Sequence, residues 1–461
     1  MPKPPIPGCP PVPRNRRLTK ETRDYAIQLM TPLFGGGVEA GKPDPMFPIR
    51  GTSIRGQLRT WWRIAYGYSL GDGMWQREEE VFGSTEFPSA LTINVLDQPI
   101  VQMVDPDYGD RFGPIAYALF AAVENKQKVA KEGGVFRLQL SWNDKTGLAN
   151  RRAAQNEQRR KDRKPPLPAV INDISADVEV ALRAWVTFGG IGARTRRGCG
   201  AVFCEHLGQS SLPSIPGKIL LGQPHATALE AWKHSLRVYQ SFRQSPRGKT
   251  HAKTIQTRNG PKTIQVPGRS HWPEADSIRQ ITGCSLKPAR ETPNGQPPAD
   301  ENANDHSTPV VPSEVLPAFP KAMLGLPINF HFAADGPGKS APGSANKDPQ
   351  GVQLVAVAPD ASGALQRLDR MASPIITRPL RIDAKWHPAV VILDRHTPHG
   401  LQFRLEGKKA KAGGGDVSHD VSMDRVVNPS LGILRPLRGK PSAVDALVDY
   451  LFANGFTEVT P

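Results

Sequence analysis

Two arginine-rich segments carry the residue types best suited to hold an anion. In "GTSIRGQLRTWWRIAYG" (51–67), Arg55, Arg59 and Arg63 recur every four residues, which predicts a basic stripe along one face of a helix. Three like charges at this spacing repel by roughly a few tenths of a kcal/mol per pair. Either a nucleic-acid backbone neutralises the stripe, or acidic side chains from elsewhere in the fold do so.

The start of this predicted helix favours an anion for a second reason. Arg50 and Gly51 precede the first turn, and either Thr52 or Ser53 is expected as the N-cap. Free N–H groups and the helix dipole attract negative charge at such an end. The opposite, core-facing side carries apolar residues that include both tryptophans, Ile54, Leu58, Trp61 and Trp62. Stacking of the tryptophans on bases is therefore the less favoured interpretation.

The second segment, "FGGIGARTRRGCG" (188–200), combines glycines with arginines. Glycines let a backbone turn sharply and lie close to a ligand, and the arginines would bind its negative charge. The simpler alternative is a glycine C-cap followed by exposed arginines, but a cap needs one glycine and not five. The residues expected to contact a ligand here are Gly189, Gly190, Gly192, Arg194, Arg196 and Arg197.

Other chemistries receive little support from the sequence. Cys199, Cys204 and His206 are badly spaced for zinc on a strand, so no metal site is expected, and four cysteines give no disulfide framework. Both Gly-Lys-Ser/Thr triplets lack the glycine that a phosphate-binding P-loop needs five residues earlier. No cofactor is expected.

The alternative function is an endoribonuclease, metal-dependent or metal-independent. Asp44 lies in the loop 35–48, between the first predicted strand and the basic helix, and one aspartate beside bound RNA could assist metal-dependent cleavage. His271 in "SHWPEAD" (270–276) is a further candidate, although a turn around Pro273 explains that cluster equally well.

The composition favours a polyanionic partner. The 461-residue chain has a formal net charge of +16 and no apolar run of the length that spans a membrane. The N-terminus is rich in proline and lacks the apolar stretch of a secretory signal, so a cytoplasmic protein is expected.

The elements that position these residues predict an α+β fold. Strands at 23–34, 90–97, 134–142 and 200–206, with helices at 51–67 and 177–188, follow the β-α-β-β-α-β order of a ferredoxin-like, or RRM-like, domain. The charged segment 150–166 is expected to be a solvated excursion.

The second half predicts a degenerate second domain of the same kind. Helices are expected at 225–242 and 442–455, with strands at 326–332, 352–358, 374–382 and 388–394. We therefore expect a basic tail (1–17), one ferredoxin-like domain (18–212) and another (213–461). Irregular insertions are expected in the second domain at about 243–270, 286–315 and 334–351.

Both arginine-rich segments resemble the hallmark segments of the RAMP superfamily, the RNA-binding proteins of CRISPR effector complexes. More narrowly, the chain is similar to the Cmr-type subunits that cap type III-B complexes. This similarity is carried by "TPLFGGGVEAGKPD", "PIRGTSIRGQLRTWWR", "GRSHWPEADSIRQ", "FPKAMLGLPINFHF" and "RMASPIITRPL".

The resemblance implies a non-catalytic role in antiviral defence. Such a subunit sits near the 3′ end of the guide RNA, helps to capture target RNA and contacts other subunits of the ribonucleoprotein. Carried onto this chain, the RNA contacts would be Arg50, Ser53, Arg55, Arg59, Arg63 and the loop Gly189–Arg197. In that family the cleaving aspartate belongs to a different subunit, so Asp44 is expected to be structural. The endoribonuclease alternative would process guide RNA or cleave target RNA.

Overall fold

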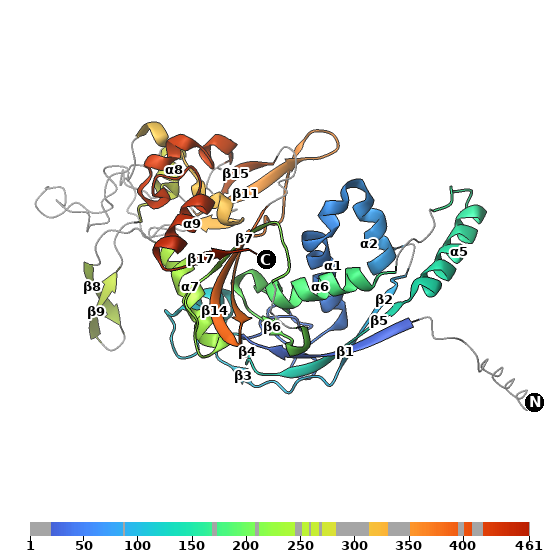
Figure 1. Ribbon diagram of the computed structural model, residues 1–461. Coiled ribbons are helices and arrows are strands. Elements are labelled where there is room, and N and C mark those ends of the chain that lie inside the picture. Colours follow the sequence, from blue (N-terminus) through green and yellow to red (C-terminus); the bar gives the residue numbers. More distant parts are fainter. Residues whose placement is uncertain are drawn as a thin grey trace, which may run out of the picture.

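The computed structural model is a mixed α+β protein whose sheets are antiparallel (Figure 1). It describes residues 20–85, 88–167, 173–207, 212–244, 251–257, 260–266, 270–282, 313–330, 351–394, 401–407 and 418–460. The predicted tail 1–17 lies outside the described residues, as do nearly all of 286–315 and 334–351 and part of 243–270. Within the described residues, no helix has the length and apolar composition that a membrane crossing requires.

The first sheet has the strand order β2-β5-β1-β6. Its strands are β1 (Lys20–Leu29), β2 (Leu91–Leu96), β5 (Val135–Asn143) and β6 (Val202–Phe203). Alternate residues of β5 are buried, which is the pattern of a sheet covered on one face. All four predicted strands exist, but β1 ends at Leu29 and β6 keeps only two residues of its predicted seven.

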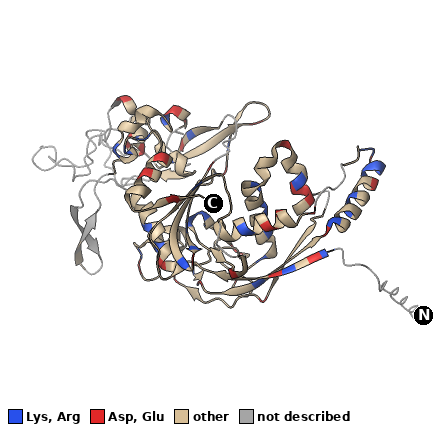
Figure 2. Cartoon of the chain, in the orientation of Figure 1, with Lys and Arg blue, Asp and Glu red and all other residues tan. Residues whose placement is uncertain are grey.

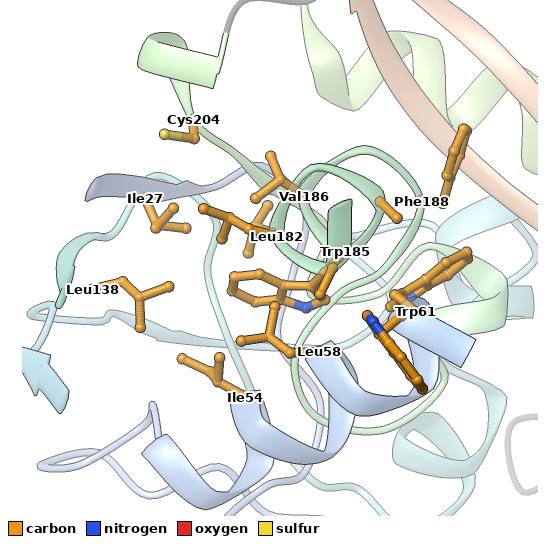
Figure 3. Packing of buried hydrophobic residues seen from close by; sticks show 14 of the residues in the cluster. Ile27, Ile54, Leu58, Trp61, Leu138, Leu182, Trp185, Val186, Phe188 and Cys204 are labelled. Atoms are coloured by element: carbon orange, nitrogen blue, oxygen red, sulfur yellow. The ribbon is translucent and has the colours of Figure 1, made fainter. Parts of the chain in front are cut away.

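Two helices, α1 (Gly51–Ala65) and α6 (Ser175–Phe188), cover this sheet. Their apolar side chains meet the inward residues of the strands in one cluster. Figure 3 shows Trp185 of α6 beside Leu58 of α1, with Ile27 and Leu138 of the sheet close by. Trp61 and Trp62 are buried in the same cluster, so their predicted place in the core is confirmed.

Most of the charged segment 150–166, predicted to be a solvated excursion, is helical, and few of its side chains are buried. Residues Lys145–Lys161 form the helix α5, and the Asp144 carboxylate caps it by accepting a hydrogen bond from the Gly147 amide at 2.7 Å. Alanine, arginine and glutamine have high helix propensity, so the segment is helical although little of it is buried.

The second half of the chain forms a sheet with the order β13-β14-β7-β17. Its strands are β7 (Gly217–Leu221), β13 (Ile375–Ile382), β14 (Lys385–Leu393) and β17 (Thr457–Val459), and its helices are α7 (Ala228–Gln244) and α9 (Ala443–Ala453). The sequence predicted β13, β14 and both helices but neither β7 nor β17.

A third sheet is built from segments that interrupt the second. Its order is β10-β11-β15-β16, with β12 paired to β11, from β10 (Ile328–Phe330), β11 (Val352–Pro359), β12 (Leu365–Arg367), β15 (Gln402–Gly407) and β16 (Ser418–Val421). The predicted strands 326–332 and 352–358 therefore belong to this sheet and not to the second one, which corrects the expectation.

Smaller elements complete the described structure. They are the pairs β3 (Met103–Val104) with β4 (Val129–Ala130) and β8 (His251–Thr257) with β9 (Gly260–Val266), and the helices α2 (Met74–Phe82), α3 (Pro114–Ala118), α4 (Phe120–Glu124) and α8 (Glu274–Ile281). Short 3-10 segments include η1 (Gly67–Gly73) and η2 (Thr195–Arg197).

The two halves share buried surface. Ile376 and Leu380 of β13 and Val391 of β14 belong to the same hydrophobic cluster as the core of the first sheet. Arg378 of β13 is 2% exposed and donates hydrogen bonds to carbonyl oxygens of the first half, those of Gly189 at 2.8 Å and Val186 at 3.0 Å. The carbonyl oxygens at the C-terminal end of α6 thus accept hydrogen bonds from a cation of the second half.

Candidate nucleic-acid interface

The N-terminus of α1 carries no side-chain cap. The helix begins at Gly51, and its N-cap is Arg50, whose backbone is extended and whose side chain makes no capping bond. The prediction of Thr52 or Ser53 as the cap is wrong, because both lie inside the first turn. That turn holds no acidic residue, and Ser53 is exposed. Its N–H groups are therefore open to an anionic ligand.

The basic stripe of α1 is divided between two environments. Arg59 and Arg63 both form ion pairs with Glu78 of α2, which is 1% exposed. Burial raises the pKa of the Glu78 carboxyl, but the hydrogen bonds and charges of Arg63 and Arg59 outweigh burial, so the pKa is lowered. Glu78 thus supplies the negative charge that a phosphate backbone would otherwise have to supply.

Arg55 differs from the other two arginines of the stripe. It is half-buried, burial lowers the pKa of its guanidinium, and no carboxylate of the described residues forms an ion pair with it. It lies one turn from the uncapped end of α1. That end of the helix therefore carries two cations, Arg50 and Arg55, and the hydroxyl group of Ser53.

The glycines of the segment 188–200 lie against protein. Gly189 and Gly190 are buried, and a Cβ atom on Gly189 would lie 2.5 Å from Nε1 of Trp61. At Gly192, where φ is +80°, a Cβ would lie 2.5 Å from the Phe34 carbonyl oxygen. The absence of side chains here serves packing of the loop against α1 and the chain after β1.

This packing joins the two glycine-rich loops of the first half. The Ala193 amide donates to the Phe34 carbonyl at 2.6 Å, and the Gly200 amide donates to the Pro32 carbonyl at 2.8 Å. The segment "GGG" at 35–37 follows directly, and Gly36 lies against Gly192. Both sequence motifs therefore meet in space, backbone against backbone.

The three arginines of the second loop have different surroundings. Arg194 donates to the Ala118 carbonyl at 3.0 Å. The Arg197 guanidinium stacks on the rings of Tyr117 at 4.7 Å and Tyr239 at 4.9 Å. Arg196 has a buried Nη1 atom without a hydrogen-bond partner among the described residues, and burial lowers the pKa of its guanidinium. Figure 2 shows that cations are also spread over other elements, including α5.

Asp44 is held by its own loop. Its Oδ1 atom accepts hydrogen bonds from the amides of Met46 at 2.9 Å and Phe47 at 3.0 Å. These bonds lower the pKa of the carboxyl, with a smaller contribution from the charge of Arg50. The carboxylate stabilises the turn that leads into α1.

The two cysteines that were considered for metal binding lie in the protein interior. Cys199 and Cys204 are buried free thiols, and burial raises the pKa of Cys199 to about 12. The described residues contain no cluster of three side chains that could hold a metal ion.

Two histidine contacts are also present. His271, a candidate for nuclease chemistry, pairs through Nδ1 with Arg435 at 3.2 Å. Sequence reasoning missed that His225 and His234 share a hydrogen bond of 2.8 Å, since nine residues of separation gave no sign of it.

Comparison with known proteins supports one assignment. The family model of the RAMP superfamily matches residues 26–203, and no curated protein matches the chain. Among solved structures, the chain is similar to the apo-form crystal structure of Cmr1 from Pyrococcus furiosus, with 13% identity and a TM-score of 0.40 over 95% of this chain and 98% of that one. The matched segment holds α1, α6, both glycine-rich loops and the first sheet apart from residues 20–25 of β1. Residues 26–203 of this chain are thus similar to the RAMP superfamily.

Proposed function

We propose that this protein is a non-catalytic RNA-binding subunit of a type III-B CRISPR effector complex. It caps the complex near the 3′ end of the guide RNA and helps to capture target RNA, with guide RNA, target RNA and neighbouring subunits as its partners in the cytoplasm. The RAMP match over 26–203, the sequence resemblance to Cmr-type capping subunits and the net charge of +16 support this proposal.

One observation carries the RNA-binding part of the proposal. The first turn of α1 is uncapped, lacks acidic residues and is flanked by Arg50 and Arg55. Helix N-termini of this kind bind phosphate through free N–H groups, and the adjacent guanidinium groups add charge-assisted hydrogen bonds. Ser53, exposed in the same turn, adds a donor for a phosphate oxygen.

We also propose that both halves are ferredoxin-like domains, residues 18–212 and 213–461. In the first half, the chain order β1-α1-β2-β5-α6-β6 and the sheet order β2-β5-β1-β6 support this assignment. In the second half, the chain order β7-α7-β13-β14-α9-β17 and the sheet order β13-β14-β7-β17 follow the same scheme. The third sheet then consists of two insertions into the second domain, one between α7 and β13 and the other between β14 and α9.

Binding of single-stranded RNA, followed by fluorescence anisotropy over a series of salt concentrations, tests the proposal. Each phosphate contact on a single strand contributes about 0.7 to the slope of log affinity against log salt. We expect Arg55→Ala to weaken binding and to reduce this slope by about that amount. Arg160→Ala, which removes an exposed arginine of α5 paired with Glu157, is the matched control and should change neither.

Two results would count against the proposal. If the salt dependence of binding is unchanged in Arg55→Ala, Arg55 at the start of α1 does not contact the RNA. If the wild-type protein binds no RNA, the proposed RNA-binding function is wrong. The endoribonuclease alternative is tested in the same preparations by following the length of the bound RNA. Cleavage by the wild type that disappears in Asp44→Asn would favour that alternative, because the substitution removes the charge and leaves the side chain's size unchanged.

A further inference from the structure

A cavity of about 330 Å³ lies between helical segments of the first half and the strand ends of the second and third sheets. The end of α1 and η1 contribute Ile64 and Tyr68, and η2 contributes Arg196. The chain between β12 and β13 contributes residues 370–374, and Leu393 and Asp394 close the cavity from the end of β14. Its walls therefore come from both halves of the molecule and from the approach to the third sheet.

Among the side chains that line this cavity, that of Arg196 has a buried polar atom, Nη1, without a hydrogen-bond partner among the described residues. A buried donor on a charged group is costly when it has no partner. The Nη1 atom of Arg197 next to it is also buried and without a partner among the described residues, but Arg197 lies against two tyrosine rings and does not line the cavity. Arg370 lines the same cavity and adds a second positive charge.

The remaining walls fit an aromatic, partly polar ligand. Ile64 and Met371 provide apolar surface, and the Tyr68 ring, 42% exposed, provides a face on which a base can stack. Asp394 lines the cavity and can accept a hydrogen bond from a ribose hydroxyl or a base amino group. An anionic group beside the arginines and a flat ring beside Tyr68 together describe a nucleotide, and the volume is that of a small-molecule site.

We infer that this cavity binds one unstacked nucleotide of the RNA, with its phosphate at Arg196 and Arg370 and its base against Tyr68. The inference rests on the proposed function, since the nucleotide belongs to the RNA that the protein binds. It adds a specific site, separate from the phosphate contacts at the start of α1. Bases that leave the stack and lie on aromatic side chains are a common mode of single-strand recognition.

Photocrosslinking of the full-length protein to RNA tests the inference. A series of single-stranded oligonucleotides, each with one 4-thiouridine, is irradiated in the complex and the crosslinked peptides are identified by mass spectrometry. We expect one uridine position to crosslink to peptides that contain Tyr68 or Met371. Tyr68→Phe keeps the ring and should keep RNA affinity, whereas Tyr68→Ala should weaken it.

Arg196→Met supplies the second readout. Loss of a charge-assisted hydrogen bond should weaken RNA binding about tenfold, while the Tm of the RNA-free protein should rise because a buried unpaired donor is removed. Arg111→Met, at an exposed arginine of the same domain, is the control and should change neither value. A lower Tm for Arg196→Met would make Arg196 a structural residue and overturn the inference.

The failures of the two proposals are distinguishable. If the wild type binds no RNA, the proposed function fails and the nucleotide site fails with it. If RNA binds but crosslinks elsewhere, and Arg196→Met binds as tightly as the wild type, only this inference fails. Adenosine 5′-monophosphate alone is a further arm. If it raises the Tm through Arg196 while the RNA crosslinks elsewhere, the cavity takes a free nucleotide, and the RNA assignment is overturned.

Discussion

Glu78 is the residue on which the arrangement of the α1 arginines depends. It is buried between Arg59 and Arg63, so Glu78→Gln should leave two cations facing each other without a counter-charge. We expect a loss of about 2–3 kcal/mol in the free energy of unfolding at pH 7. Glu79→Gln, one residue along the same helix, is the control, and thermal unfolding measures both.

The pH dependence of this loss has a definite sign. The pKa of Glu78 in the folded protein lies below its ordinary value of 4.5, so its stabilisation is complete above that value and disappears as the pH falls through the folded pKa. The difference in stability between wild type and Glu78→Gln should therefore shrink in acid. A difference that stays constant down to pH 3 would contradict the ion-pair interpretation.

The periodicity of α1 could predict the basic stripe but not its partner. Every fourth residue on a helix shares a face, so Arg55, Arg59 and Arg63 follow from the sequence. Which acid meets them depends on how α2 folds back over α1, and several acidic residues near position 78 would look equally suitable. Two of the three arginines that were proposed to contact RNA from this helix, Arg59 and Arg63, thus have a protein partner that local spacing could not reveal.

At the scale of elements, glycine positions decide how closely the loops approach. Gly198 has a φ of +75°, and a Cβ there would lie 2.1 Å from the Thr377 carbonyl oxygen of β13. Gly198→Ala should cost about 3 kcal/mol, from backbone strain and from overpacking. Gly439 has a φ of +79° with nothing near its Cβ position, so Gly439→Ala should show the backbone strain alone. Equal melting temperatures for both variants would argue against a tight contact at Gly198.

Elements with a clear period were predicted correctly, and short or uniformly polar ones were not. The alternation of β5 and the apolar faces of α1 and α6 identify these elements. The strand β17 has three residues and β7 has five, too few to show a period. Helix α5 is polar on most of its surface, so its cap and helix propensity were the only available signals.

At the scale of the whole molecule, Arg378 connects the two halves. Arg378→Met removes the donors to the Gly189 and Val186 carbonyls and leaves these buried groups unpaired. We expect differential scanning calorimetry to resolve the wild-type transition into two, with the first half unfolding at the lower temperature. Arg367→Met, at a half-exposed arginine that pairs with Glu406, should keep the wild-type profile. An unchanged profile in Arg378→Met would show that apolar contacts alone couple the halves.

The segment "RMASPIITRPL" supports the family resemblance, but its structural role could not be predicted from the sequence. Arg370 at its start lines the cavity, and Arg378 near its end satisfies the last turn of α6. Both roles depend on residues more than one hundred positions away in the chain, so no local pattern could assign them.

The dependence of α6 on Arg378 also has a consequence for synthesis. A growing polypeptide leaves the ribosome from its N-terminus, so residues 20–207 emerge well before residue 378. During that interval the carbonyls of Val186 and Gly189 have no guanidinium to bond. The first half can therefore reach its final packing only after translation has passed β13, which supplies Arg378 and part of the shared core.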